Sequence, residues 1–135
     1  MSHILQSIEV AMMSPATLNP HNLTLYLRSI GHWGLQCNVA GMIHRYYRKA
    51  NNKIQRAAYM SILNDLLRTP SYREEMLKVV VEVFVETYLQ ADREKNVEEK
   101  SLLRLLRKSW KDGTVPATQL ERMRAIIWSY RRLDI

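Results

Sequence analysis

Residues 57–71, "AAYMSILNDLLRTPS", decide the fold class of this chain. Apolar residues recur there at helical spacing, and the Thr69–Pro70 pair ends the pattern, so the stretch predicts one amphipathic helix with a sharp stop. The same period continues along nearly the whole chain, and no convincing period-2 strand run is found. We therefore expect an all-α domain of about seven helices joined by short turns.

Helix boundaries follow from capping residues. Helices are expected to begin at Asn19, at the Asn51–Asn52 pair and at Asn96; Ser71 and Glu74 have capping-box spacing, and Gly31 is expected to close the second helix. The predicted helices cover residues 3–13, 20–30, 33–49, 53–68, 72–90, 97–111 and 116–135. The helix predicted over 72–90 is apolar on nearly all sides, which is typical of a central helix.

Composition narrows the class of protein. The 135 residues suit one domain, residues 1–135, and no run is apolar enough for a membrane span. Twenty Lys and Arg against 13 Asp and Glu give a net charge of +7, which favours an anionic partner. Cys37 is the single cysteine, so an intrachain disulfide is excluded and a reducing compartment is indicated.

Two helix faces are candidate binding surfaces. The polar face of the helix over 53–68 has i, i+3, i+4, i+7 spacing and consists of Ser61, Asn64, Asp65 and Arg68. The basic face of the helix over 97–111 has the same spacing and consists of Arg104, Arg107, Lys108 and Lys111. It is expected to lie opposite the apolar residues Leu102, Leu103, Leu106 and Trp110. Each face is also compatible with plain solvated surface.

The two faces suit different parts of a peptide. Asp and Asn on a rigid helix can bond the backbone and hydroxyl groups of an extended peptide, and arginine forks suit phosphate. From residue 100 to residue 132, nine basic residues stand against two acidic ones. The four histidines have no metal-ligand spacing, and neither a phosphate-binding glycine loop nor a nucleophile elbow is present. The sequence therefore indicates no enzyme, no metal and no cofactor.

An ordered set of motifs resembles a known family. "KIQRAAYMSILNDLLRTP", residues 53–70, is similar to the fourth helix of the domains that bind the C-terminal repeat tail of RNA polymerase II. Other features agree with the family in order and spacing. They are Leu23–Thr24, the "RKA" phrase of residues 48–50, and the helix that contains Trp110 with its "G-x-V" turn, Gly113 to Val115. The resemblance covers residues 3 to 128.

The resemblance implies a right-handed superhelix of about eight helices, related to the VHS and ENTH folds. It also implies a non-catalytic, nuclear, monomeric module that binds the phosphorylated tail and couples transcription to RNA 3′-end processing or termination. On this view the chain is the N-terminal part of a longer factor.

Residue by residue, the resemblance implies that Asn64 and Asp65 contact the peptide and that Ser14 borders the peptide groove. Ser61 stands where the family has a tyrosine, and Thr69 stands where it has an asparagine. The phosphoserine-binding arginine of the family falls on Leu105, between Arg104 and Arg107. We therefore expect a neighbouring arginine to bind the phosphate, or a different phosphate preference.

Two alternatives belong to other functional classes. One is a trafficking adaptor of the VHS/ENTH type that binds acidic lipid through the basic face, although residues 3–13 lack the Lys/Arg face expected of a membrane-surface helix. The other is RNA binding by the basic C-terminal third, where Trp110, Trp128 and Tyr130 could stack on bases. RNA contact could also accompany binding of the tail.

Overall fold

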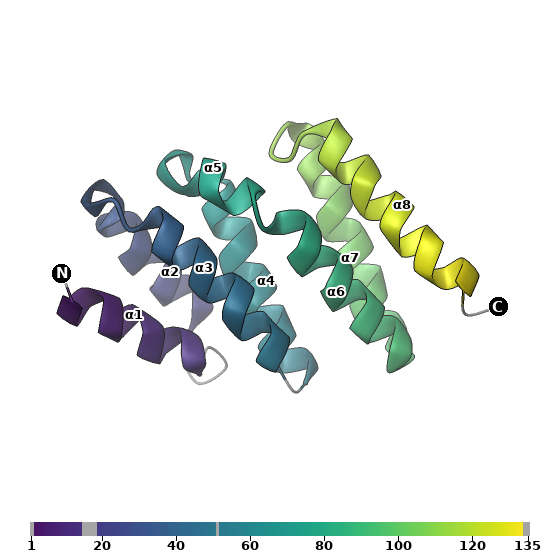
Figure 1. Cartoon of the computed structure of the whole chain (residues 1–135), viewed down its shortest axis with the longest axis horizontal. Helices are drawn as coiled ribbons and strands as arrows, with labels where there is room; N and C mark the ends of the chain where they lie inside the picture. Colours follow the sequence, from purple (N-terminus) through teal and green to yellow (C-terminus); the bar gives the residue numbers. More distant parts are fainter. Residues whose placement is uncertain (1, 15–18, 51, 134–135) are drawn as a thin grey trace. The chain divides into compact units, whose positions relative to one another are not determined.

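The computed structural model describes residues 2–14, 19–50 and 52–133. These residues form eight α-helices and three short 3-10 helices, and no strand occurs among them. The expected all-α class is thereby confirmed (Figure 1). The α-helices are α1 (Ser2–Met13), α2 (Pro20–Ser29), α3 (Gln36–Tyr46), α4 (Lys53–Leu67), α5 (Pro70–Leu77), α6 (Val80–Arg93), α7 (Val97–Ser109) and α8 (Ala117–Leu133). The 3-10 helices are η1 (Gly31–Trp33), η2 (Tyr47–Lys49) and η3 (Trp110–Asp112).

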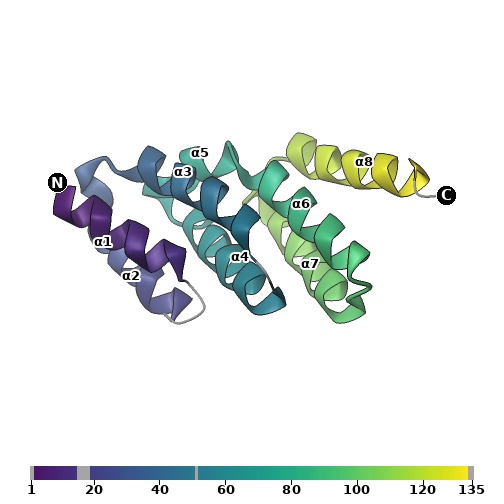
Figure 2. The ribbon, with the colours of Figure 1, turned by 60° about the horizontal axis from the view of Figure 1, so that its bottom comes forward.

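The chain divides into two compact units, Met1–Val79 and Val80–Ile135. In the first unit, α1 packs on α3, α2 packs on α4, and α5 packs on both α3 and α4 (Figure 2). In the second unit, α6 packs on both α7 and α8. Each unit is thus a set of packed helix pairs, whereas the single domain of residues 1–135 and its superhelical shape stay predictions.

The three asparagine caps are confirmed. The side chains of Asn19, Asn52 and Asn96 accept hydrogen bonds from the backbone N–H groups of His21, Gln55 and Glu99 at 2.9, 3.0 and 3.0 Å. Each bond satisfies a backbone donor that the first helical turn leaves without an intrahelical partner.

Several boundaries differ from the sequence prediction; the helix expected over 33–49, for example, is α3 at Gln36–Tyr46 followed by η2. The helix expected over 72–90 is two helices, and the break between α5 and α6 falls at residues 78–79. The expected Ser71 cap is wrong, because α5 begins two residues before the predicted start, at Pro70, a residue whose fixed φ suits a first helical turn. The second helix ends at Ser29 instead of residue 30, Gly31 begins η1 rather than closing the helix, and the left-handed turn lies at Gly34, with φ of 73°.

α6 is central to the second unit, as its apolar circumference predicts. Nine of its residues are buried, from Val80 to Ala91. Phe84 packs edge-on against Trp110 of η3, with ring centroids 5.7 Å apart, and both side chains are almost fully buried. No helix among the described residues combines the length and apolar character needed to cross a membrane.

In the first unit two buried tyrosines join helices through main-chain carbonyls. The Tyr59 hydroxyl on α4 donates to the Met12 carbonyl of α1, and the Tyr72 hydroxyl on α5 donates to the Leu27 carbonyl of α2, each at 2.5 Å. Burial raises the pKa of Tyr59 to about 12 and also raises the pKa of Tyr72. The neutral hydroxyl is therefore the form that the folded unit requires.

We expect the free energy of unfolding to fall as the pH rises from about 10, the ordinary tyrosine pKa, toward 12. In that window the folded state still holds the Tyr59 proton while the unfolded chain loses it, so the stabilisation present below pH 10 is lost. Urea unfolding of wild type and Tyr59→Phe at pH 8, 10 and 11 measures this effect. The substitution should flatten the pH dependence, whereas Tyr26→Phe, at an exposed site, should not.

Candidate functional site

A pocket of about 360 Å³ lies in the second unit, where α6, α7 and α8 meet. Its lining combines three cationic residues with aromatic and aliphatic ones. The lining residues are Phe84, Tyr88, Arg104, Arg107, Arg124, Ile127 and Trp128. Since α6 contributes aromatic rings and the other two helices contribute arginines, the pocket suits an anionic ligand that has some apolar surface.

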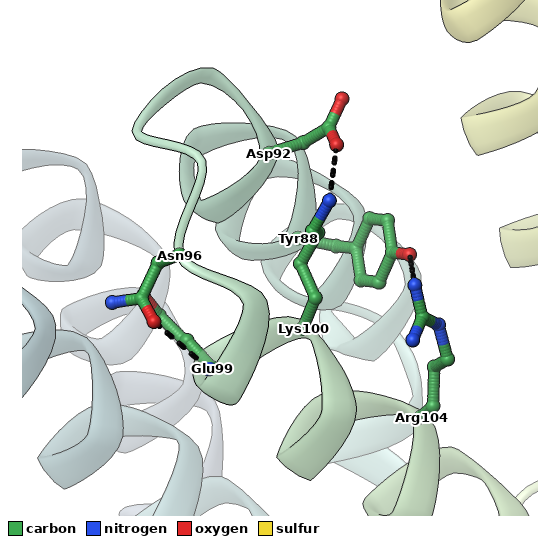
Figure 3. A network of polar contacts seen from close by, with 6 residues as sticks. All are labelled: Tyr88, Asp92, Asn96, Glu99, Lys100 and Arg104. Carbon is green, nitrogen blue, oxygen red and sulfur yellow. Dashed lines mark hydrogen bonds and ion pairs between the residues drawn. The ribbon is translucent and has the colours of Figure 1, made fainter.

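The α6–α7 pair fixes one wall of the pocket through side-chain contacts (Figure 3). Lys100 pairs with Asp92 at 2.8 Å, and both side chains are largely shielded from solvent. One turn further along α7, a terminal nitrogen of Arg104 donates to the Tyr88 hydroxyl at 3.0 Å, with the guanidinium carbon 5.8 Å from the ring centroid. Arg104 is therefore held against α6, beside the pocket.

Arg107 is anchored to the other neighbouring helix. Its Nε and one terminal nitrogen donate to the Leu120 carbonyl of α8 at 3.3 and 2.7 Å. Arg124, one turn further along α8, pairs with Glu121 at 3.2 Å through largely exposed side chains. Such an exposed ion pair is weak, so Glu121 compensates the charge of Arg124 only in part.

The charge balance of the pocket favours an anion. Among the described residues, Arg104 and Arg107 form no ion pair with a carboxylate; their acceptors are the neutral Tyr88 hydroxyl and the neutral Leu120 carbonyl. Two positioned guanidinium groups that lack a counter-charge provide charge-assisted donors for phosphate or carboxylate oxygens.

The predicted basic face is divided by the structure. It brings Arg104 and Arg107 into the pocket and adds Arg124, whereas Lys108 and Lys111 are exposed and are not part of the lining. Leu105, where the resemblance places the family's arginine, is 63% exposed and is also outside the lining. The apolar residues predicted opposite the basic face are only partly buried. Leu103 and Trp110 are buried, whereas Leu102 is exposed.

The predicted peptide-binding residues all lie in the first unit. Asn64 and Asp65 are half-buried on α4, Ser61 and Arg68 are exposed on the same helix or its cap, and Ser14 is exposed just after α1. The pocket, by contrast, lies in the second unit, so the two predicted surfaces belong to different units.

Arg28 of α2 joins the polar end of α4 and was not predicted. Its Nε donates to the Thr69 hydroxyl at 3.0 Å, and a terminal nitrogen reaches the Asp65 carbonyl at 3.5 Å. The Thr69 hydroxyl itself donates to the Asp65 carbonyl at 2.8 Å. Position 69 therefore closes α4 and holds an arginine beside Asp65, a role that follows from the contact between α2 and α4.

Neither a metal site in the described part of the chain nor a relative of known function was found. The described residues contain no group of three His, Cys, Asp or Glu side chains placed to hold a metal ion. Comparison with models of known families, with curated proteins and with solved structures finds no match.

Proposed function

We propose that this chain is a non-catalytic module that binds an extended phosphorylated peptide, the C-terminal repeat tail of RNA polymerase II. The observation that carries the proposal is the pocket in which Arg104 and Arg107 are positioned by neutral acceptors. The tail as the source of the phosphate, the nuclear location, the monomeric state and the role in 3′-end processing or termination rest on the sequence resemblance alone.

Phosphate binding follows from the donors of the pocket. A phosphate group offers several acceptor oxygens, and each charge-assisted bond contributes about 1.5–3 kcal/mol. Arg104, Arg107 and Arg124 come from two helices that α6 holds together, so their guanidinium groups are partly preorganised. Such preorganisation lowers the entropy lost on binding.

Peptide binding on the first unit follows from the polar face of α4. Asn64 and Asp65 have an amide and a carboxylate side chain on a rigid helix, and Arg28 reaches the Asp65 main-chain carbonyl. In the proposed complex the Asp65 carboxylate accepts a backbone or hydroxyl donor of the peptide, and the arginines of the pocket take the phosphate.

The proposal is tested by titrating a labelled, serine-phosphorylated tail peptide and following fluorescence anisotropy. Arg104→Gln should weaken binding by about tenfold or more, because it removes one charge-assisted donor. Asp65→Ala should weaken binding of the phosphorylated and the unphosphorylated peptide by the same factor, because the proposed partner of the Asp65 carboxylate is not the phosphate. Lys108→Gln, which removes one charge of the same helix outside the lining, is the matched control.

Superimposable titration curves for wild type, Arg104→Gln and Asp65→Ala would rule the proposal out. Vesicles with and without phosphoinositide, and RNA titrated at several salt concentrations, provide the comparison ligands. Tighter binding to either of these than to the phosphorylated peptide would favour the corresponding alternative, an adaptor for acidic lipid or an RNA-binding domain.

A further inference from the structure

The pocket has an aromatic and aliphatic wall as well as its arginines. Trp128 and Ile127 of α8 line it together with Tyr88 of α6, and Trp128 is 61% exposed. Arg124 precedes Trp128 by four residues, so the two side chains share one face of α8. A large indole that stays exposed beside guanidinium groups provides a flat surface for an aromatic ring.

Hydrogen-bond capacity remains on the polar side of the pocket. Arg104 donates from one terminal nitrogen to Tyr88, and Arg107 donates from two nitrogens to a single carbonyl, so each retains N–H groups without an acceptor among the described residues. The Tyr88 hydroxyl accepts from Arg104, and its own proton is left to donate. These donors suit an acceptor-rich group.

The lining offers little for reading the edge of a nucleobase. Among the described residues it contains no Asn, Gln, Asp, Glu, Ser or Thr side chain, so only the arginines, which suit guanine acceptors and are also the phosphate donors, could read a base edge. Its polar groups are arginines and one tyrosine hydroxyl, which match phosphoryl oxygens. A phosphorylated aromatic side chain therefore matches the lining better than a nucleotide does.

We propose that this pocket binds phosphotyrosine, with the phosphoryl group on the arginines and the phenyl ring against Trp128. The inference rests on the proposed phosphopeptide-binding function and narrows it to one class of phosphorylated residue. A phosphoserine would place only a methylene group beside the aromatic wall, whereas a phosphotyrosine ring buries apolar surface there and lies within reach of a cation–π contact with an arginine.

The test uses two tripeptides that differ only in the central residue, glycine-flanked phosphotyrosine and glycine-flanked phosphoserine. Each is titrated into the whole chain, and the backbone amide signals of α8 are followed by NMR. The phosphotyrosine tripeptide should bind about tenfold more tightly, the combined effect of ring stacking and cation–π contact. Equal affinities would overturn the inference.

Two variants separate the ring contact from the phosphate contact. Trp128→Ala should remove the preference by weakening the phosphotyrosine tripeptide about tenfold and leaving the phosphoserine tripeptide unchanged. Arg104→Gln should weaken both. Trp33→Ala, at an exposed tryptophan of the first unit, is the matched control and should change neither affinity. A preference that survives Trp128→Ala would overturn the proposed ring contact.

The outcomes also separate this inference from the proposed function. Arg104-dependent binding of the serine-phosphorylated tail, without a phosphotyrosine preference, would overturn the inference and leave the proposed function standing. Trp128-dependent binding of phosphotyrosine, without any binding of the tail, would overturn the proposed function and leave the inference standing. Tighter binding of adenosine monophosphate than of the phosphotyrosine tripeptide would overturn the inference in favour of a nucleotide site.

Discussion

Trp110→Ala is expected to lower the free energy of unfolding of the second unit by about 3–5 kcal/mol. Trp110 has no exposed surface, and its ring packs edge-on against Phe84 with centroids 5.7 Å apart. Alanine would leave a cavity among residues that α6, α7 and α8 hold in place, so relaxation could fill only part of it. The loss is large relative to the stability of an ordinary small domain.

Urea unfolding followed by circular dichroism at 222 nm measures the effect. Trp128→Ala removes the same side chain from a largely exposed position and should change the free energy of unfolding by no more than about 0.5 kcal/mol. Similar losses for the two substitutions would show that Trp110 is not part of the core of this unit.

The double charge reversal Arg104→Glu, Arg124→Glu is expected to weaken binding of the phosphorylated peptide by at least about a hundredfold. It replaces two charge-assisted donors by carboxylates that repel the phosphate. Arg107 is left in place because it holds the Leu120 carbonyl, and its loss would loosen α8. Both replaced residues are exposed, so the unit should remain folded.

Fluorescence anisotropy against the phosphorylated peptide measures the loss, with Lys108→Glu, Lys111→Glu as the matched control. The control pair changes the net charge of the chain by the same amount on α7 and the adjoining η3, but outside the pocket lining. Binding should fall much less for the lysine pair. An equal fall for both pairs would mean that general attraction to a basic protein, rather than the pocket, accounts for binding.

Local features of the sequence were sufficient for the helix starts at the asparagine caps. Asn19, Asn52 and Asn96 begin helices as predicted, because each cap bond joins residues two or three positions apart. Gly113, with φ of 105°, likewise ends η3 where the sequence predicts a stop. These features depend on neighbouring residues alone, so a pattern in the sequence predicts them.

The wrongly predicted helix boundaries lie where the sequence gives no local signal or two conflicting ones. The apolar period runs through residues 78–79 without a Pro or Gly, so the sequence does not signal the break between α5 and α6. Ser71 and Glu74 have capping-box spacing, yet Thr69 and Pro70 precede them and begin the helix. α5 also packs on α3, a helix distant in sequence, and such contacts are not visible in a local pattern.

The candidate site shows the same division. The period of basic residues identified Arg104 and Arg107, but Lys108 and Lys111 fit that period equally well and lie outside the pocket. Tyr88 falls in the apolar stripe of its helix, so no pattern marked it as a partner for an arginine.

By itself the sequence determined an all-α chain, the helix starts at its asparagine caps, and a basic α7. Only the tertiary structure decided which cations line a pocket. The physical reason is range: a cap bond spans two or three residues, whereas the contacts that position Arg104 and Arg107 reach 16 and 13 residues along the chain, to Tyr88 and Leu120. Those partners come together only when α6, α7 and α8 pack.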